Sequence, residues 1–238
     1  KQFLQDNDIP VAEFANINNE DELEQMIKCM GLPLLLKTRR DAYDGRGNYK
    51  INSKLEINDA LDLFSGKLLM VEKFVKFEKE ISVIAARNTK GDITTYPVVE
   101  NIHENNILKI TIAPGRVSEE VRTKAEKIAK KTMEVLHGAG VFGIEMFVTS
   151  DDKVLINEIA PRVHNSGHHT LQSCNTSQFD QHLRAILGMD LGDSSIKYPT
   201  IMYNILGPKT FQGEYNVLFK KQDNVYLKMY GKLESKPQ

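Results

Sequence analysis

The sequence predicts a mixed α+β fold in which antiparallel hairpins carry the polar positions and helices cover one face. Two stretches predict hairpins, because β-branched and apolar runs flank polar turns over residues 81–100 and again over residues 141–159. A third stretch predicts a covering helix, because Ser118 is a favourable N-cap and apolar residues recur at helical spacing up to residue 136. We therefore expect paired strands with helices packed against them.

Composition argues against several functional classes. The 238 residues are 41% hydrophobic and 26% charged, which is typical of a soluble globular protein with one large domain or two small ones. Lysine and arginine (31) balance aspartate and glutamate (32), so bulk nucleic-acid binding is not expected. No apolar run approaches the ~20 residues of a membrane span, and no signal peptide opens the chain. Cys29 and Cys174 lie far apart without metal-ligand spacing, which indicates reduced thiols in a cytoplasmic protein.

The first third of the chain is predicted to alternate helices and strands. Acidic residues open the first long helix and Gly31 ends it. A capping box from Ser53 to Glu56 is expected to start the next helix. The expected elements are a helix over residues 19–31, a strand over 33–37, a helix over 53–64 and a strand over 68–72.

The remainder of the chain is predicted to be rich in strands, with two amphipathic helices. The second of these helices is expected to turn Phe179, Leu183, Ile186 and Leu187 inward. The expected elements are strands over residues 81–86, 93–100, 107–112, 141–149, 154–159, 200–206 and 225–229, and helices over 118–137 and 177–187.

The hairpin of residues 141–159 predicts a pair of facing carboxylates. If its turn is centred between Asp151 and Asp152, Glu145 lies directly opposite Glu158 on the neighbouring strand. Like charges in that arrangement are destabilising. A hard divalent cation is the simplest compensation, because Mg²⁺ is bound by one or two carboxylates together with substrate phosphates. The alternative is that one glutamate faces solvent and the other pairs with a lysine.

The loop after Glu158 is the second candidate site. It gathers Arg162, His164, His168 and His169 among proline and glycine, and a strand that ends in such a loop is a usual place for function. An alternative is a metal-dependent hydrolase, because His164 and His168 are four residues apart and would form a zinc pair on a helix. The intervening Asn-Ser-Gly makes a helix unfavourable there.

A glycine-rich loop follows Lys37, which closes an apolar strand. Gly45 and Gly47 allow the backbone to approach a ligand, and successive N–H groups in such a turn can form an anion nest. Arg46 could clamp a phosphate or carboxylate. The alternative is a mobile hairpin tip with solvated arginines. Together with the paired carboxylates, this loop suggests a nucleotide and Mg²⁺ held between sheets.

These motifs together resemble the ATP-grasp enzymes. They are Lys37, the Tyr-Asp-Gly-Arg-Gly run of residues 43–47, Glu72-Lys73, Glu145, and the Asn-Glu-Ile-Ala-Pro-Arg-Val-His-Asn-Ser-Gly-His run of residues 157–168. Within that family the chain looks like the N5-carboxyaminoimidazole ribonucleotide synthetases, the ATP-dependent carboxylases of purine biosynthesis. The resemblance covers nearly the whole chain and implies an ATP-grasp fold, with the nucleotide between two mostly antiparallel sheets.

The resemblance also implies a domain organisation. An ATP-grasp subdomain A is expected over residues 1–76, with the tail of a missing N-terminal domain at about 1–8. Subdomain B is expected over 77–195, and a small, truncated C-terminal subdomain over 196–238. A homodimer in the cytoplasm is implied by the same likeness.

The resemblance implies that ATP and bicarbonate form carboxyphosphate, which then carboxylates the exocyclic amine of 5-aminoimidazole ribonucleotide. Glu145 and Glu158 would ligate Mg²⁺. The implied ATP-binding residues are Lys37 and Lys73 near the phosphates and the adenine pocket, the hinge Glu72, Lys73, Phe74 and Val75 beside adenine, Glu80 on the ribose, His103, Asn157, Glu158, and Asp44, Gly45 and Gly47 of the glycine-rich loop.

The implied catalytic pocket binds bicarbonate and carboxyphosphate. Its residues would be Tyr43, Arg46, Arg162 and His164, with Lys232 as a C-terminal substrate contact. Arg162 is expected to be the main electrostatic stabiliser; the alternative is a structural salt bridge between Arg162 and Glu158. Ala160 stands where other ATP-grasp enzymes often have asparagine, and Lys236 where the resembling branch usually has arginine.

Two further alternatives concern the reaction as a whole. One is a nucleotide-binding fragment that does not turn over because its N-terminal domain is missing. The other is a related ATP-grasp carboxylase or ligase that uses a different acceptor.

Overall fold

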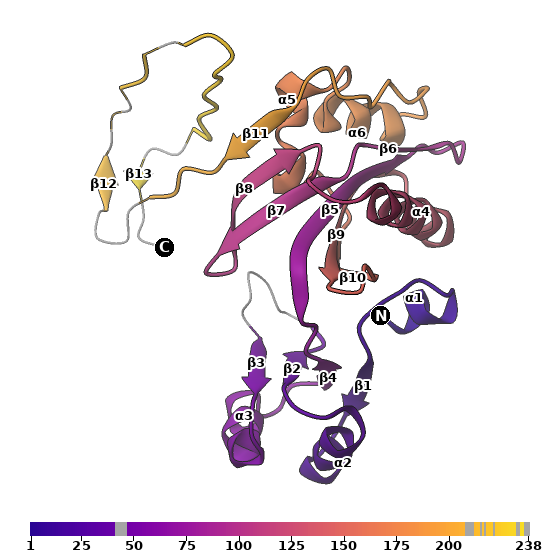
Figure 1. The fold of residues 1–238 in the computed structure, drawn as a ribbon, viewed down its shortest axis with the longest axis vertical. Helices are drawn as coiled ribbons and strands as arrows, with labels where there is room; N and C mark the ends of the chain where they lie inside the picture. The colour runs from indigo at the N-terminus through magenta and orange to yellow at the C-terminus, as the bar shows by residue number, and fades with distance from the viewer. Residues whose placement is uncertain are drawn as a thin grey trace.

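The chain folds around a smaller and a larger antiparallel sheet, one above the other in Figure 1. The computed structural model describes residues 1–40, 47–207, 212–214, 216, 218–220, 222–231 and 234–235. Within these ranges the smaller sheet has four strands and the larger has seven. The predicted α+β fold with two antiparallel sheets is confirmed.

The smaller sheet has the strand order β1-β4-β2-β3 and is covered by two helices. Its apolar core joins residues of β2 and β4 with α2 and α3, for example Leu34, Leu36 and Val71 with Leu23 and Ala60. The elements of this part are α1 (Gln2–Asp6), β1 (Phe14–Ile17), α2 (Glu20–Met30), β2 (Leu34–Thr38), β3 (Asn48–Ile51), the 3₁₀ turn η1 (Lys54–Glu56), α3 (Ile57–Leu63) and β4 (Leu69–Lys73).

The helix starts show where local sequence decided the structure. The Asn19 side chain accepts the Glu22 N–H and caps α2, so this helix begins next to the predicted residue 19. The capping box at Ser53 is wrong in detail, because Ser53 caps no backbone N–H. Instead the Glu56 carboxylate accepts the Asn52 N–H at 2.9 Å, which tightens residues 54–56 into η1 and delays α3.

The larger sheet has the strand order β10-β9-β5-β7-β8-β11, and β6 pairs with β5 beside it. The predicted strand over residues 93–100 is divided at Pro97, since proline cannot donate to a ladder. The strands are β5 (Phe77–Arg87), β6 (Ile93–Thr95), β7 (Val99–Glu104), β8 (Ile107–Ala113), β9 (Gly140–Thr149), β10 (Val154–Ala160) and β11 (Thr200–Tyr203).

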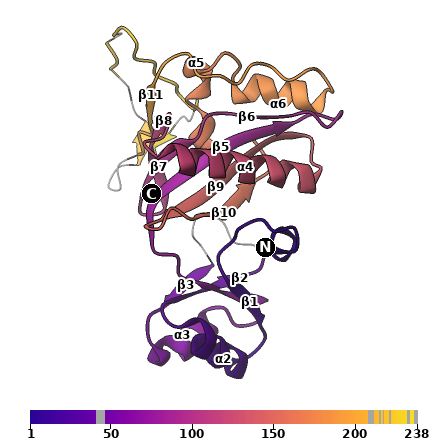
Figure 2. The same cartoon turned by 45° about the vertical axis from the view of Figure 1, so that its right-hand side comes forward.

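Helices lie on both faces of the larger sheet, which corrects the prediction that they cover one face. On β5, Ile81, Val83 and Ala85 share a core with α4 (Glu119–Leu136), whereas Ile84 and Ala86 pack on the opposite face. Helix α6 (Gln178–Ile186) contacts β9 and β5, and Figure 2 shows α4 and α6 on opposite sides of β5. The second face is thus covered near one end of the strands.

The inward face of α6 was predicted wrongly. Leu183, Ile186 and Leu187 are 55%, 44% and 70% exposed, while Gln178 and Gln181 are buried. The two glutamines lie inward because they bind loop backbone: Gln178 donates to the His164 carbonyl, and Gln181 to the Gly192 carbonyl. Helical spacing cannot distinguish an apolar face that packs from one that stays at the surface.

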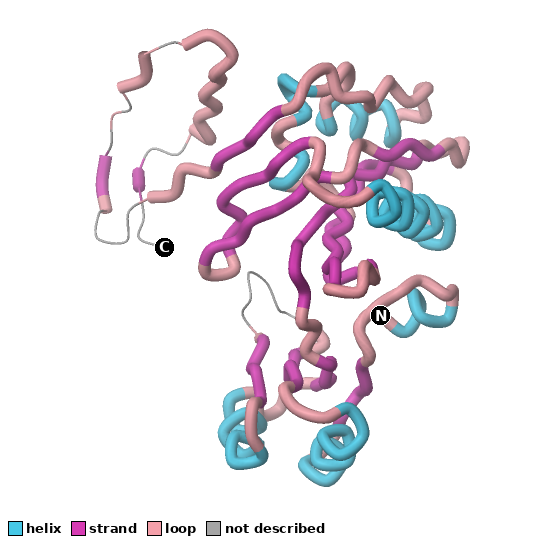
Figure 3. The backbone as a smooth tube through the Cα atoms, in the orientation of Figure 1, coloured by secondary structure: helices cyan, strands magenta, loops and turns pink. Residues whose placement is uncertain are grey.

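After α6 the described chain runs mostly as loop (Figure 3). Strand β11 ends at Tyr203 rather than at residue 206, and the predicted strand over residues 225–229 is absent from the described chain. The other short elements are the 3₁₀ turn η2 (Asn165–Gly167), α5 (Thr170–Ser173), β12 (Gly213–Glu214) and β13 (Glu234–Ser235). The division at residues 76 and 195 stays a prediction; β11, which lies beyond residue 195, pairs with β8.

No helix in the described ranges is long and apolar enough to cross a membrane.

Candidate active site

The predicted pairing of Glu145 with Glu158 is confirmed, but the register is reached in a different way. Val154 pairs with Val148, so the turn is centred on Asp151 and not between Asp151 and Asp152. A β-bulge at Asn157 then shifts the register by one residue and brings Glu158 opposite Glu145. The carboxylate pair thus depends on the bulge, which is a common feature beside active sites.

Glu145 lies at the centre of a polar region on the face of the larger sheet that α6 leaves open. Its Oε1 is 3.7 Å from Nε2 of His164, and its side chain is 19% exposed. Burial is the largest influence on the Glu145 carboxyl and raises its pKa. His103 lowers the pKa, while the Glu158 and Glu80 carboxylates raise it further, and the net direction is upward. In the free protein the ionised form of Glu145 is therefore less favourable than that of an ordinary solvated glutamate.

Glu80 and His103 form a second pair on this face. Glu80 of β5 and Asn101 of β7 are cross-strand partners, and the Glu80 Oε2 lies 2.8 Å from Nδ1 of His103. Burial lowers the pKa of His103, but the hydrogen bond and charge of Glu80 outweigh it, so the pKa is raised. The structure thus brings together two residues that the sequence linked only through family likeness.

His164 packs directly on β9, and Gly143 makes this possible. A Cβ at Gly143 would lie 2.5 Å from Cβ of His164 and 2.6 Å from its Cγ, closer than real contacts. The His164 backbone is held by Gln178, whose amide accepts the His164 N–H and donates to its carbonyl. Burial, and next the charge of Arg162, lowers the pKa of His164 to about 4, so the imidazole is neutral at pH 7.

Arg162 extends from the end of β10 into solvent. Its Nη1 donates to the Val163 carbonyl at 3.0 Å, and among the described residues no carboxylate lies within 4.0 Å of its guanidinium. The alternative of a structural salt bridge to Glu158 therefore finds no support. An exposed guanidinium beside two carboxylates and a neutral histidine is suited to binding an anion.

The three histidines of the loop separate into different environments. His168 shares a hydrogen bond between its Nδ1 and Gln178, and its ring stacks 5.5 Å from Phe179. Nδ1 of His169 lies 2.7 Å from the Ser173 hydroxyl. Over the described ranges, no group of three His, Cys, Asp or Glu residues could hold a metal ion by itself. This arrangement argues against the zinc-hydrolase alternative.

Burial of His169 predicts a pH-dependent stability. Burial lowers its pKa from 6.5 to about 4, so from pH 6.5 downward the unfolded chain binds a proton that the native chain does not. The free energy of unfolding should therefore fall as the pH drops from 6.5 towards 4, with about 3 kcal/mol due to this residue. Urea unfolding at pH 7 and pH 5 should show a smaller loss for His169→Asn than for the wild type.

A matched control is His137→Asn. His137 is exposed at the end of α4 with φ 54°, a conformation that asparagine tolerates. This variant should keep the wild-type pH dependence. An unchanged pH dependence in His169→Asn would contradict the assignment.

The smaller sheet contributes a buried ion-pair cluster. Glu72 is 1% exposed; its Oε1 lies 3.1 Å from Nζ of Lys37, and its Oε2 lies 2.8 Å from Nζ of Lys1. Lys73 is exposed and lies 3.6 Å from Glu13, so it is separate from this cluster. Phe74 packs under Lys50, whose Nζ lies 4.0 Å from the ring centroid. Lys37 and Glu72 thus lie together, while Lys73 does not join them.

A cavity of about 480 Å³ connects the two sheets. Arg39, just after β2, lines it from the smaller sheet, and Asn157 and Glu158 line it from the bulge of β10. Residues 10 and 11 lie along β10, where the Pro10 carbonyl accepts the Ile156 N–H. The full lining is Lys1, Leu4, Val11, Arg39, Ile156, Asn157, Glu158 and Ile159. Arg39 was not singled out from sequence, although its position beside Lys37 was a signal.

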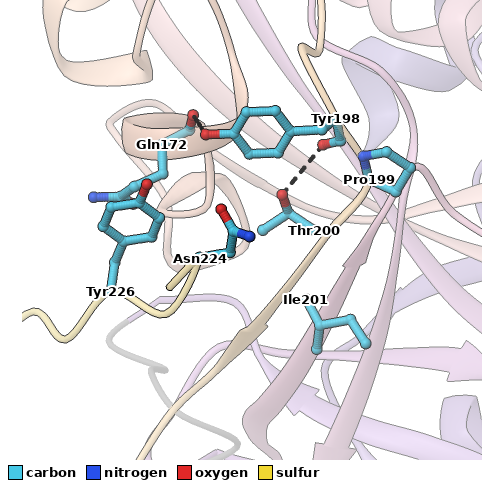
Figure 4. A pocket seen from close by; sticks show the side chains of 7 residues that line it. All are labelled: Gln172, Tyr198, Pro199, Thr200, Ile201, Asn224 and Tyr226. Carbon is cyan, nitrogen blue, oxygen red and sulfur yellow. Dashed lines mark hydrogen bonds between the residues drawn. The ribbon is translucent and has the colours of Figure 1, made fainter. Parts of the chain in front are cut away.

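A second cavity, of about 380 Å³, lies between α5 and the approach to β11 (Figure 4). The Tyr198 side chain lines it, and its hydroxyl donates to the Gln172 carbonyl at 2.9 Å. Tyr226 of the C-terminal segment lies on the other side. None of the predicted site residues is among the described residues that line it.

Several predicted residues lie outside the described ranges. These are Tyr43, Asp44, Gly45, Arg46 and Lys232. Gly47, the last residue of the glycine-rich run, is described; its carbonyl accepts the Thr38 N–H at 2.9 Å, and its φ of 87° requires glycine.

The paired glutamates fit a magnesium ion that also binds phosphate. Both supply hard oxygen donors from adjacent strands, and their mutual repulsion raises the pKa of Glu145. Two carboxylates are too few for a closed protein site. Mg²⁺ usually keeps water or substrate phosphate in its remaining positions, so this donor set suits it.

Comparison with known proteins identifies similar chains. A family model described as the ATP-grasp domain matches residues 2–179. The N5-carboxyaminoimidazole ribonucleotide synthase of Bacillus subtilis is 39% identical over 236 residues, covering 99% of this chain and 62% of that protein. The phosphoribosylaminoimidazole carboxylase of Candida glabrata is 41% identical over 250 residues, covering 100% of this chain and 43% of that protein. The chain thus spans about three fifths or less of these relatives.

Solved structures show the same likeness. The N5-carboxyaminoimidazole ribonucleotide synthetase of Thermotoga maritima has a TM-score of 0.86 at 38% identity, with 99% of this chain and 62% of that chain covered. The carboxyaminoimidazole ribonucleotide synthase of Aspergillus clavatus complexed with ATP has a TM-score of 0.81 at 41% identity, with 87% and 55% covered. The Aspergillus enzyme is also known in complex with ADP and 5-aminoimidazole ribonucleotide, at TM-score 0.80, 38% identity and coverages of 87% and 55%.

Proposed function

The chain belongs to the ATP-grasp family, and on that premise we propose that it forms the ATP-binding and carboxylating centre of an N5-carboxyaminoimidazole ribonucleotide synthetase. In the proposed reaction, bicarbonate attacks the γ-phosphate of ATP and releases ADP. The resulting carboxyphosphate transfers its carboxyl group to the exocyclic amine of 5-aminoimidazole ribonucleotide and releases phosphate.

The observation that carries the proposal is the facing pair Glu145 and Glu158 beside the cavity between the sheets. Lys37, Glu72 and Arg39 approach from the smaller sheet. Glu80 and His103 lie on the same face of the larger sheet as Glu145. A nucleotide between the sheets would meet cations at its phosphates and a carboxylate suited to ribose hydroxyls.

Each described residue has a proposed role. Glu145 and Glu158 would hold Mg²⁺, which supplies charge neutralisation and alignment of the phosphates during transfer. Arg162, exposed and charged, would stabilise bicarbonate and carboxyphosphate as their negative charge develops. His164 would contact the same anions as a neutral imidazole. Lys37 would contact the ATP phosphates, and the backbone from Glu72 to Val75 would adjoin adenine.

The family likeness extends to assembly and to residues outside the described ranges. We propose a homodimer, and roles for Tyr43 and Arg46 in the anion pocket and for Lys232 on the ribonucleotide. A second candidate function is nucleotide binding without turnover, which the facing glutamates and the cavity between the sheets would serve equally well.

The test is ADP release by the purified chain with Mg²⁺-ATP, measured with and without bicarbonate and with and without 5-aminoimidazole ribonucleotide. We expect release that requires bicarbonate, rises with the ribonucleotide and disappears in Glu158→Gln. Binding of Mg²⁺-ATP without release would favour the non-catalytic function. ADP release that requires bicarbonate but does not change when the ribonucleotide is added would favour a related carboxylase with another acceptor.

A further inference from the structure

A line of buried hydrogen bonds crosses the larger sheet and ends at His164. Thr111 on β8 donates to Oδ1 of Asn101 on β7 at 3.0 Å, and the Asn101 amide donates to Ser82 on β5 at 2.9 Å. The Ser82 hydroxyl donates to Ser166 of η2 at 2.8 Å. The Ser166 Oγ lies 2.9 Å from Nδ1 of His164. The line therefore joins three strands and the site loop.

The direction of these bonds follows from the donors. An amide N–H₂ can only donate, so Ser82 accepts from Asn101 and its own hydrogen is directed to Ser166. Ser166 accepts that hydrogen, so its hydroxyl hydrogen is available for Nδ1 of His164. The Ser82 and Ser166 hydroxyls each accept on one side and donate on the other, and Thr111 starts the line as a donor.

The backbone supports the same direction at the histidine. The Ser166 N–H points to Nδ1 of His164 at 3.4 Å, and a backbone N–H cannot accept. This contact is satisfied when Nδ1 is the unprotonated nitrogen of the neutral ring, but at 3.4 Å it is weaker than the 2.9 Å contact with the Ser166 hydroxyl, so the direction of the hydroxyl line decides the tautomer. The hydrogen then resides on Nε2, which faces Oε1 of Glu145 at 3.7 Å.

Burying these polar side chains inside the sheet is energetically unfavourable unless all of their hydrogen bonds are made. Ser82, Thr111 and Ser166 are fully buried and Asn101 is 4% exposed. The next inward residue of β5 on this face, Ile84, is apolar and packs in a hydrophobic cluster. Buried polar groups must be fully satisfied, and apolar residues of similar size would pack there without that requirement. A role beyond packing would explain why polar residues occupy these positions.

We propose that Thr111, Asn101, Ser82 and Ser166 are positioning residues that hold His164 in the Nε2–H tautomer. They keep its ring oriented so that the Nε2–H is presented to the pocket shared with Glu145. The inference deepens the proposed function, on which its consequence for catalysis rests. Its structural content, the tautomer of His164, can be measured without substrate.

The tautomer is measured by long-range ¹H–¹⁵N NMR of the chain labelled at histidine. His164 is assigned from the signal lost in His164→Gln. At pH 7 we expect unprotonated Nδ1 and protonated Nε2. An Nδ1–H tautomer, which the opposite orientation of the Asn101 amide would produce, would overturn the inference.

Asn101→Asp tests the direction of the line. A carboxylate would accept from both Thr111 and Ser82, so Ser82 could no longer donate to Ser166 and the polarity would reverse. We expect the His164 signal to shift towards the Nδ1–H tautomer. Thr111→Val, which removes one hydroxyl at constant shape, is a milder second variant and should populate both tautomers. An unchanged tautomer in both variants would overturn the inference.

Kinetics separates positioning from general destabilisation. Ser166→Ala removes the donor to Nδ1 and should lower kcat for ADP release about tenfold, with KM for ATP unchanged. The matched control is Thr132→Val, because the buried Thr132 hydroxyl bonds the Ile128 carbonyl on α4, on the other face of the sheet. It should change neither the tautomer nor kcat.

A wild-type chain with the expected tautomer but no ADP release would refute the proposed function and leave the tautomer assignment intact.

Discussion

Glu145→Gln is expected to abolish ADP release while making the free chain more stable. The variant keeps the shape of the side chain but removes one of the two facing carboxylates. Loss of a ligand that aligns and neutralises the transferring phosphate should lower kcat at least about 100-fold. The same glutamate is half of a like-charge pair that the free site disfavours.

The gain in stability has a defined origin and pH dependence. Burial raises the pKa of Glu145, and Glu158 and Glu80 raise it further. At pH 7 the native chain therefore holds a charge that is less favourable there than in the unfolded chain. Glutamine should raise the free energy of unfolding by up to about 1 kcal/mol. This advantage should vanish as the pH falls to the ordinary carboxyl value of 4.5 and below, where Glu145 is neutral in both states.

Two measurements check this prediction together: ADP release, and urea unfolding at pH 7 and pH 4 without Mg²⁺. Glu134→Gln, an exposed glutamate of α4, is the matched control and should leave both unchanged. A Glu145→Gln chain that is less stable at pH 7 would mean that the carboxylate is already compensated in the free protein. Retained ADP release would remove Glu145 from the proposed metal site.

Gly143→Ala is expected to disable the site by displacing His164. The new Cβ would lie 2.5 Å from the His164 Cβ, so either β9 or the loop must move. Neither segment can move easily, because β9 pairs with a strand on each side and the backbone of the loop is fixed at His164 by Gln178. A displacement of about 1 Å at a reacting group can cost about 100-fold in rate, and overpacking costs about 1–3 kcal/mol of stability.

A control variant separates the loss of rate from the loss of stability. Gly66→Ala strains a glycine with φ 75° that has open space around its Cβ position, far along the chain from His164. It should destabilise the protein by about 1 kcal/mol and leave kcat unchanged. If Gly143→Ala kept its ADP release at a temperature where it is fully folded, the contact between Gly143 and His164 would not matter for the reaction.

Local sequence predicted those features that depend on a few neighbouring residues. Ser118 caps α4 as expected, and Asn19 caps α2 in the same way, because a side-chain oxygen can satisfy an N–H three residues on without help from the rest of the fold. The turn near Asp151 predicted that β9 and β10 pair, but a turn centred on Asp151 would by itself bring Asn157, and not Glu158, opposite Glu145. The bulge at Asn157 was not predicted, since an extra residue in a ladder leaves no distinctive local pattern.

Helix α6 shows why a periodic pattern is insufficient. Its leucines and isoleucine have helical spacing, yet they lie outward while Gln178 and Gln181 are buried. The glutamines bind the His164 and Gly192 backbones, which are distant in sequence. A partner that arrives from elsewhere in the chain can reverse the face that hydrophobicity alone would bury.

By itself, the sequence determined the antiparallel α+β architecture, the pairing of the two strands that carry Glu145 and Glu158, and the loop rich in arginine and histidine, because strand alternation and turn chemistry act over short distances. Tertiary structure alone decided which of these groups meet. It separated His168 and His169 from His164, joined Lys37 to Glu72, and aligned Thr111, Asn101 and Ser82 beneath Ser166. The physical reason is that hydrogen bonds and burial are set by neighbours across strands, and the order of those strands follows from packing of the whole sheet.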